Sequence, residues 1–212
     1  PVTEALPAKG LRLGILRDIV LDDLEKPVAE AFDRALARLA AAGASLADAR
    51  FPEIAEIPAL NARASLLVAE AWRGHRARIA EKGEAYDPRV RMRLELGKAI
   101  TAADLLDTLA RRKELIAAFT ALARGFDALI MPTVPMVPPA IAALAEDRDY
   151  VRLNAMSLRN TTLFNVLDGC SISMPMTPRG EAPAGLMLAA AHGSDDRLFA
   201  TALAVEAIVS PR

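Results

Sequence analysis

Residues 126–135, Phe-Asp-Ala-Leu-Ile-Met-Pro-Thr-Val-Pro, decide the fold of the chain around them. The run 126–131 is short and almost continuously apolar, which is typical of a strand buried on both faces of a sheet. Pro132 has no N–H to give to a strand ladder, so we expect the strand to end there. Thr133 then leaves the sheet at the strand tip, where α/β folds place ligand crevices. The sequence therefore predicts a pocket next to Thr133.

A helix and two strands are expected after this stretch. Residues 150–167 are predicted to be helical, and the glycine at 169 to end the helix. In 170–175, apolar residues alternate with Ser171 and Ser173, which predicts a strand with one apolar face and one hydroxyl face. Turn residues at 177–181 predict that 184–190 returns antiparallel beside that strand.

The last helix is expected to begin after Ser194, which can cap it. Asp195 and Asp196 stand in its first turn, where acidic side chains interact well with the helix dipole. The two aspartates are better explained in this way than as metal ligands, since His192 is the only extra ligand nearby in sequence. We predict no metal site.

The beginning of the chain predicts a parallel crossover. Residues 1–10 are expected to form a linker and 11–16 a strand. A helix is predicted from Pro27, with apolar residues spaced three and four apart until Gly43, and 44–51 is a second strand candidate. Strand, helix and strand in this order indicate an α/β fold with a mixed β-sheet flanked by helices.

Residues 59–124 are expected to form a helical insertion between sheet strands. The pattern predicts one long helix over 59–81, a loop, a short helix over 89–97, and a third helix opened by a capping box at Thr101 and Asp104. Asp107 and Arg111 are four residues apart and are predicted to pair on that helix, for about 0.3–0.5 kcal/mol.

Composition excludes several classes of protein. The chain has 212 residues, 53% of them hydrophobic, which is enough to bury a core. A formal net charge of −1 gives no basic surface for nucleic acid or an anionic membrane. One cysteine excludes an internal disulfide framework, and without a membrane-spanning run or a signal peptide we expect a cytoplasmic protein.

Several motifs in order resemble the C-terminal half of the amidase-signature enzymes, which are serine hydrolases of amide bonds. That family has a D-x-L-hydrophobic-x-P-T-x-P segment, a T-x-x-x-N segment leading into a strand that ends in proline, a P-x-G-L segment and a D-x-x-L-L helix. The matching residues here are 127–135, 161–165 leading into 171–175, 183–186 and 195–199. The resemblance implies the C-terminal half of an amidase-signature α/β/α sandwich, with 126–209 forming one wall of the pocket.

The catalytic residues of that family cannot be placed on this chain. The resemblance implies a lysine, a bridging serine and a nucleophilic serine in a Gly/Ser-rich run, with backbone N–H groups stabilising the oxyanion. Here no two glycines are adjacent and there is no G-x-S-x-G segment. The five lysines, at 9, 26, 82, 98 and 113, are expected in linkers or on helix surfaces. We therefore assign no catalytic residue to this chain and expect that the Lys-Ser-Ser set belongs to a half preceding Pro1.

Other candidates for chemistry have simpler explanations. Ser171 and Ser173 have no lysine or histidine nearby in sequence to activate them. His75 and His192 each lack a partner for acid–base catalysis in the sequence. Cys170 is better explained as a small buried apolar residue than as a nucleophile. Trp72 is better explained as a core residue than as an aromatic side chain that covers the pocket.

Four residues are predicted to line a substrate pocket: Thr133, Asn165, Ser171 and Ser173. Thr133 ends a strand, Asn165 precedes the hydroxyl-bearing strand, and the two serines share that strand. Simpler roles for Thr133 and Asn165 are a loop hydrogen bond and a helix cap. Asp168 and Cys170 stand where the family often has glycine and proline. This difference leaves open which acyl group the enzyme recognises.

The sequence therefore predicts the C-terminal portion of an amidase that hydrolyses carboxamide C–N bonds through an acyl-serine. This chain alone is expected to be inactive, to need no cofactor, and either to dimerise or to require its missing half, because an incomplete sheet exposes an edge. The alternatives are a non-catalytic binding or assembly module with half an amidase fold, and an amidotransferase A-like subunit with a partner.

Overall fold

The computed structural model describes residues 4–210, in two compact units. The larger unit contains the chain up to Ile54 and from Ile116 onward, and the smaller unit contains Ala55–Leu115. Of the expected linker 1–10, residues 1–3 lie outside the described residues. Within the described part, no helix is long and apolar enough to cross a membrane.

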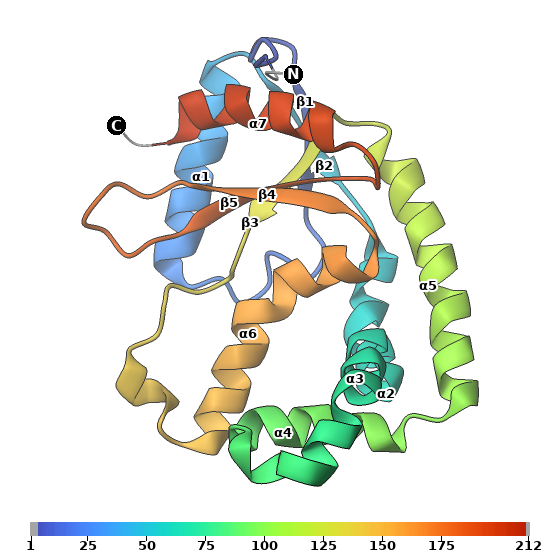
Figure 1. The fold of residues 1–212 in the computed structure, drawn as a ribbon. Coiled ribbons are helices and arrows are strands. Elements are labelled where there is room, and N and C mark those ends of the chain that lie inside the picture. The colour runs from blue at the N-terminus through green and yellow to red at the C-terminus, as the bar shows by residue number, and fades with distance from the viewer. Residues whose placement is uncertain (1–3, 211–212) are drawn as a thin grey trace. The chain divides into compact units, whose positions relative to one another are not determined.

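The larger unit is built on one five-stranded mixed sheet in the order β2-β1-β3-β5-β4 (Figure 1). Strand β1 is parallel to both β2 and β3, whereas β5 is antiparallel to β3 and β4. The predicted mixed α/β sheet, parallel crossover and antiparallel return are thus confirmed. The elements are β1 (Arg12–Leu16), α1 (Lys26–Ala41), β2 (Ser45–Ala49), β3 (Ala128–Pro132), η4 (Ile141–Leu144), α6 (Asp147–Val166), β4 (Cys170–Pro175), β5 (Gly185–Ala190) and α7 (Asp195–Val209).

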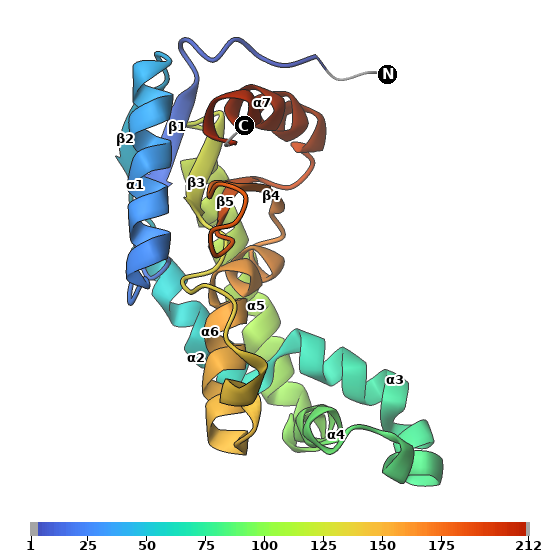
Figure 2. The same ribbon diagram turned by 90° about the vertical axis from the view of Figure 1, so that its left-hand side faces the viewer.

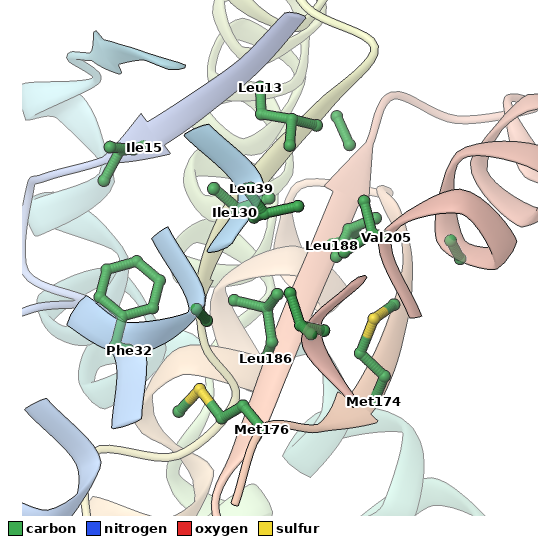
Figure 3. Close-up of a cluster of buried hydrophobic side chains, with 14 of the residues drawn as sticks. Leu13, Ile15, Phe32, Leu39, Ile130, Met174, Met176, Leu186, Leu188 and Val205 are labelled. Carbon is green, nitrogen blue, oxygen red and sulfur yellow. The ribbon is translucent and has the colours of Figure 1, made fainter. Parts of the chain in front are cut away.

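One face of this sheet packs against α1 and α7 (Figure 3). Alternation along the strands directs Ile130 of β3 and Leu188 of β5 toward this face. Phe32 of α1 and Val205 of α7 are buried in the same cluster. Burying a large apolar side chain of this kind contributes about 1.5–3 kcal/mol, so this layer stabilises the sheet that positions the pocket.

An aromatic group lies within the larger unit as well. The rings of Phe51 and Phe119 are 6.2 Å apart between centroids, and those of Phe119 and Phe164 are 5.8 Å apart with an edge-to-face geometry. Phe119 and Phe164 are each 1% exposed. Edge-to-face pairs add about 0.5–1.5 kcal/mol beyond their burial, so this contact fixes the end of α6 to the last turns of α5 (Ala102–Ala123).

The ends of the larger unit's elements follow from local chemistry. Pro27 occupies the first turn of α1, where its missing N–H has no intrahelical partner to lose. Pro132 is the last residue of β3, as predicted. Ser194 precedes α7, but its side chain makes no capping hydrogen bond, so the predicted side-chain cap was wrong. Its backbone oxygen instead accepts from Leu198 N–H at 2.8 Å.

The smaller unit is helical. After η1 (Pro52–Glu56), it contains α2 (Ile57–Ala64), α3 (Leu66–Lys82), η2 (Gly83–Ala85), α4 (Pro88–Glu95), η3 (Leu96–Ala99) and the first part of α5. The single helix predicted over 59–81 is two helices, because extended Ser65 interrupts it and its hydroxyl accepts from Val68 N–H at 3.4 Å. Thr101 caps α5 by accepting from Asp104 N–H at 3.1 Å, as expected.

The ion pairs of the smaller unit differ from the predicted one. Arg111 bonds to Glu56 at 2.8 Å and to Glu114 at 2.5 Å, whereas Asp107 bonds to Arg63 at 2.8 Å. The predicted Asp107–Arg111 pair was wrong, because each of the two residues bonds to other partners. Trp72 packs on Gly97, whose Cβ would lie 2.3 Å from the Trp72 Cβ if another residue stood there.

Candidate functional site

Two of the predicted pocket residues meet at the end of β3. Thr133 follows β3 directly, and its backbone N–H donates to Gly185 O at 2.8 Å. This bond holds Thr133 beside the first residue of β5. The Oγ1 atom of Thr133 then lies 2.6 Å from Ser173 Oγ on β4, so the two hydroxyls share a hydrogen bond. The structure thus places two side chains 40 residues apart in one polar cluster.

Gly185 makes this pair possible. A Cβ at position 185 would lie 2.6 Å from Ser173 Oγ and 2.7 Å from Thr133 Oγ1, closer than such atoms can approach. Only a residue without a side chain therefore leaves room for two hydroxyls over the strand. Position 185 therefore requires glycine because the side chains of Thr133, just after β3, and Ser173, on β4, both come close to it.

A pocket of about 290 Å³ opens beside the hydroxyl pair. Its polar side chains are Thr133, Ser157 and Ser173, and the remaining lining comes from Val134 and from residues 136–139 and 183–185. None of these lining residues is ionisable. The surface therefore suits an uncharged group that is mostly apolar and can make a hydrogen bond, because a charged group would find no counterion there.

Asn160 is the residue of this region that the sequence interpretation missed. It is fully buried in α6, and its Nδ2 donates to Pro132 O at 2.8 Å and to Val20 O at 3.1 Å. The Oδ1 atom accepts from Arg159 Nε at 3.1 Å. Asn160 therefore fixes the last carbonyl of β3, immediately before Thr133, to α6 and to the segment after β1.

A sequence signal for Asn160 was present. It stands three and four residues before Leu163 and Phe164, on the same helix face, and both of those residues are buried. A lone amide on an apolar helix face is expected to bond to backbone groups in the core, because burying it unpaired is costly. The T-x-x-x-N segment instead predicts Asn165 as the pocket residue.

The other two predicted pocket residues lie elsewhere. Asn165 is exposed near the end of α6 and does not line the pocket described above. Ser171 lines a separate groove of about 180 Å³ with Cys170, Ile172 and residues of α7. The structure therefore brings Thr133 and Ser173 together but not Asn165 or Ser171.

Cys170 has the surroundings of an unreactive thiol. Burial raises the pKa of its thiol, and the carboxylate of Asp195 raises it further. The sulfur lies 3.4 Å from Ala191 O, to which the thiol donates. Because a thiol must lose its proton to attack, a raised pKa favours the interpretation of Cys170 as a small, partly buried apolar residue.

Each of the two histidines interacts with a residue outside the hydroxyl pair. Nδ1 of His192 lies 3.3 Å from Asp168 Oδ2 on an exposed surface. His75 lies in the smaller unit, with its Nδ1 2.8 Å from Tyr86 Oη. Over residues 4–210, no three His, Cys, Asp or Glu side chains gather closely enough to hold a metal ion.

The lining of the pocket offers the hydroxyl pair no base. Ser173 and Thr133 each need a base to become nucleophilic, and the pocket lining supplies neither an amine, an imidazole nor a carboxylate. What the pair offers is one hydroxyl hydrogen that is not used between the two oxygens, together with oxygen lone pairs. This arrangement suits recognition of a neutral polar group.

Comparison with known proteins shows one consistent likeness. The family model described as Amidase matches residues 3–199. The chain is 29% identical over 210 residues to 2-amino-5-chloromuconic acid deaminase of Comamonas testosteroni, covering 99% of this chain and 46% of that protein. It is 30% identical to the A subunit of glutamyl-tRNA(Gln) amidotransferase from Saccharolobus solfataricus, covering 88% of this chain and 43% of that protein.

A solved structure has the same fold. Kluyveromyces lactis allophanate hydrolase superposes with a TM-score of 0.84 at 21% identity, over 99% of this chain and 34% of that one. In each comparison nearly the whole of this chain matches a part of the relative. The chain thus spans less than half the length of these relatives.

Proposed function

The chain belongs to the Amidase family, and from that membership we propose that it forms the C-terminal portion of an enzyme that hydrolyses carboxamide C–N bonds. Its role is to supply the pocket surface around Thr133 and Ser173. The Lys-Ser-Ser catalytic set is supplied by the remaining half of the domain. The chain by itself is inactive.

The observation that carries this proposal is the hydroxyl pair in an uncharged pocket. Thr133 Oγ1 and Ser173 Oγ are 2.6 Å apart, and Gly185 leaves the space they occupy. A carboxamide is neutral and has both donor and acceptor atoms, so it can bond to such a pair without burying an uncompensated charge. The pocket thus fits the class of molecule that amidases attack.

The chemical step in this proposal follows the family mechanism. A neutral lysine accepts a proton from the bridging serine, which accepts the proton of the attacking serine. The attacking oxygen forms a bond to the amide carbon, backbone N–H groups stabilise the oxyanion, and the amine or ammonia leaves with a proton. Water then hydrolyses the acyl-serine. Residues of this chain bind and orient the substrate during these steps.

The proposal is tested by assaying two proteins on simple amides. One is this chain alone, and the other is the chain extended at its N-terminus by the remaining amidase half. We expect hydrolysis only by the extended protein, with Thr133→Val and Ser173→Ala raising KM. Thr161→Val, which removes a hydroxyl that bonds within α6 at 3.2 Å, is the matched control. Hydrolysis by the chain alone that Ser173→Ala abolishes would contradict a nucleophile located upstream.

A second candidate function is an amidotransferase A-like subunit. The observation favouring it is the 30% identity to the A subunit of glutamyl-tRNA(Gln) amidotransferase from Saccharolobus solfataricus. The near-neutral charge of this chain gives no basic footprint for tRNA, so a partner subunit would make the RNA contacts. Glutamine hydrolysis that rises only when partner subunits and glutamyl-tRNA are added would favour this function over a free-standing amidase.

A non-catalytic binding module is the remaining alternative. It would bind a neutral amide in the pocket beside Thr133 and show no hydrolysis after the remaining half is added. Such a module would be expected to act as a homodimer or with another partner. Binding without turnover in the extended protein would distinguish it from both enzyme functions.

A further inference from the structure

We propose that Glu25 is a positioning residue for the pocket beside Thr133, and that it determines how well this pocket accepts a long apolar acyl group. The inference rests on the proposed function for the class of the bound molecule, an amide. Glu25 stands immediately before α1, 112 positions away in the chain from Val137 of the pocket lining. Only the fold brings these two residues into contact.

The pocket rim, residues 134–139, needs support from other elements. Three of its six residues are prolines, at 135, 138 and 139, so half of its positions have no N–H to donate. Such a segment cannot form a helix or a continuous strand ladder of its own. All of its residues except Pro135 line the pocket. The shape of the pocket therefore depends on what holds the rim in place.

Glu25 holds the pocket rim with two hydrogen bonds. Its backbone N–H donates to Pro135 O at 2.9 Å, and its Oε2 atom accepts from Val137 N–H at 2.9 Å. The two bonds lie on either side of Met136, which is buried and lines the pocket. Figures 1 and 2 show the chain after β3 passing next to the N-terminal end of α1. Because a carboxylate is a strong acceptor, the Val137 bond is expected to fix this part of the rim.

The place of Glu25 at the start of a helix indicates that its side chain has a task outside the helix. Ser, Thr, Asp and Asn are preferred at the N-cap, because their short side chains reach the first free N–H groups of the helix. Glu25 occupies the N-cap of α1, and its side chain makes no such bond. The longer side chain reaches Val137 instead. The carboxylate thus supports the pocket rim rather than the helix.

The segment before α1, residues 17–25, has an unusual backbone conformation. Ile19 and Asp23 have φ angles of 54° and 48°, in the left-handed region that is costly for residues with a side chain, above all for a β-branched one. Arg159 Nη2 donates to Asp22 O at 2.7 Å, which ties the segment to α6. Strained residues persist only where the surrounding structure holds them. The segment is therefore a fixed arm between α6 and the pocket rim.

A fixed rim distinguishes acyl groups by their length. The acyl group of a small amide would reach few atoms of the rim, whereas a longer apolar chain would extend along Met136 and Val137. Buried methylene groups add binding free energy only where the wall packs closely against them. Loss of the Glu25 support should therefore weaken binding of long acyl groups more than that of short ones. The bond-breaking step occurs at the amide carbon and should be little affected.

Three substitutions of Glu25 separate the rim support from charge and from helix capping. Glu25→Ala removes the acceptor, whereas Glu25→Gln keeps an acceptor oxygen at the same side-chain length. Glu25→Asp keeps the charge but shortens the side chain by one methylene group, which favours a bond to the N–H groups of α1. Glu30→Ala on α1 is the matched control, because Glu30 is exposed and its carboxylate lies 3.8 Å from Lys26 Nζ.

Amide hydrogen exchange in this chain alone measures the rim support directly. We expect the Val137 amide to exchange about tenfold faster in Glu25→Ala and Glu25→Asp, and at a nearly unchanged rate in Glu25→Gln and Glu30→Ala. Thermal unfolding should show no loss of stability in Glu25→Asp, because aspartate is a preferred N-cap residue. If Glu25 only stabilised the fold, the Val137 exchange rate would instead follow the thermal midpoint.

Steady-state kinetics measure the effect on the substrate. The enzyme is this chain extended by the remaining amidase half, and the substrates are acetamide and hexanamide. In Glu25→Ala and Glu25→Asp, we expect KM for hexanamide to rise about fivefold, KM for acetamide to change less than about twofold, and kcat to stay within about twofold for both. Glu25→Gln should restore the KM for hexanamide.

The outcomes separate this proposal from the proposed function. An unchanged Val137 exchange rate in Glu25→Ala overturns the rim support, whether or not the extended protein is active. Faster exchange with equal KM changes for both amides overturns the effect on acyl length and leaves the amidase function standing.

An extended protein that hydrolyses neither amide contradicts the amidase function, and calorimetric titration of that protein with hexanamide then replaces KM. A larger Kd in Glu25→Ala than in the unchanged protein would support the role of Glu25. An equal Kd, or no binding to either protein, overturns it.

Discussion

The two edges of the sheet, β2 and β4, are finished in different ways. Asp48 on β2 bonds to Arg17 Nε at 2.8 Å, and both side chains are well exposed. On β4 the exposed residues are Ser171, Ser173 and Pro175, and the Ser173 hydroxyl is bonded to Thr133, just after β3. A charged edge resists further pairing, whereas an uncharged edge beside a pocket invites it. This contrast shows that the two edges differ in how well they resist pairing with another strand.

If the β4 side is the functional one, its buried supports should matter most to stability. Asn160→Leu removes the Asn160 donor to Pro132 O in a fully buried site and one of two donors to Val20 O, which keeps its bond from Arg159 Nη2 at 3.3 Å. We expect a loss of about 2–3 kcal/mol in the free energy of unfolding, because an unsatisfied buried group costs about 1–3 kcal/mol and Arg159 Nε also loses its bond to Asn160 Oδ1. Urea denaturation measures this loss.

Asn165→Leu is the control for that substitution. Asn165 stands on the same helix but is exposed, so its replacement should change stability by about 0.5 kcal/mol or less. An equal effect of the two substitutions would contradict the role of Asn160 as the support of the loop at Thr133.

The contrast between these two asparagines shows what the sequence can and cannot predict. Periodicity located the strands, the crossover and the antiparallel return, because each depends on residues that are close in the chain. Thr133 and Ser173 are 40 residues apart in the chain, and their contact depends on strand register and on the space left at Gly185. Which amide of a helix is buried likewise depends on the element that packs against it.

Gly185→Ala is expected to have the next largest effect. The new Cβ would meet Ser173 Oγ at 2.6 Å and Thr133 Oγ1 at 2.7 Å, so one hydroxyl or the strand must move. Overpacking of this kind costs about 1–3 kcal/mol, and the thermal midpoint should fall accordingly. Gly74→Ala is the control, because nothing lies within 4 Å of its added Cβ and the residue is helical. An unchanged midpoint for Gly185→Ala would show that the β4 side is looser than its geometry indicates.

Asp127, just before β3, tests how far charge holds α7 to the strands of the sheet. Its carboxylate accepts from Arg12 N–H at 2.7 Å and from the Arg197 guanidinium of α7. Burial raises the pKa of Asp127, but these hydrogen bonds and the nearby Arg197 charge lower it more, so the net pKa is below its ordinary value. The folded state therefore favours the ionised form.

The pH dependence follows from that direction. The stability supplied by Asp127 is complete above its unfolded pKa of about 3.9 and is lost as the pH falls through the lower folded pKa. Asp127→Asn should cost about 1–2 kcal/mol at pH 7, and the difference from the unchanged protein should shrink below about pH 4. Denaturation at pH 7 and pH 3 measures both values. A difference that grows in acid would contradict the lowered pKa.

The smallest effect is expected at the β2 edge, where Asp48→Asn breaks the pair with Arg17. Exposed pairs contribute about 0.2–1 kcal/mol, and salt screens them, so the loss should shrink further at about 1 M NaCl. Thermal unfolding at low and high salt measures this loss, with Asp33→Asn at an exposed position of α1 as the control for a lost surface charge. A loss of about 2 kcal/mol or more, insensitive to salt, would make Asp48 a structural support rather than an exposed edge charge. The two edges would then no longer differ in the way their side chains indicate.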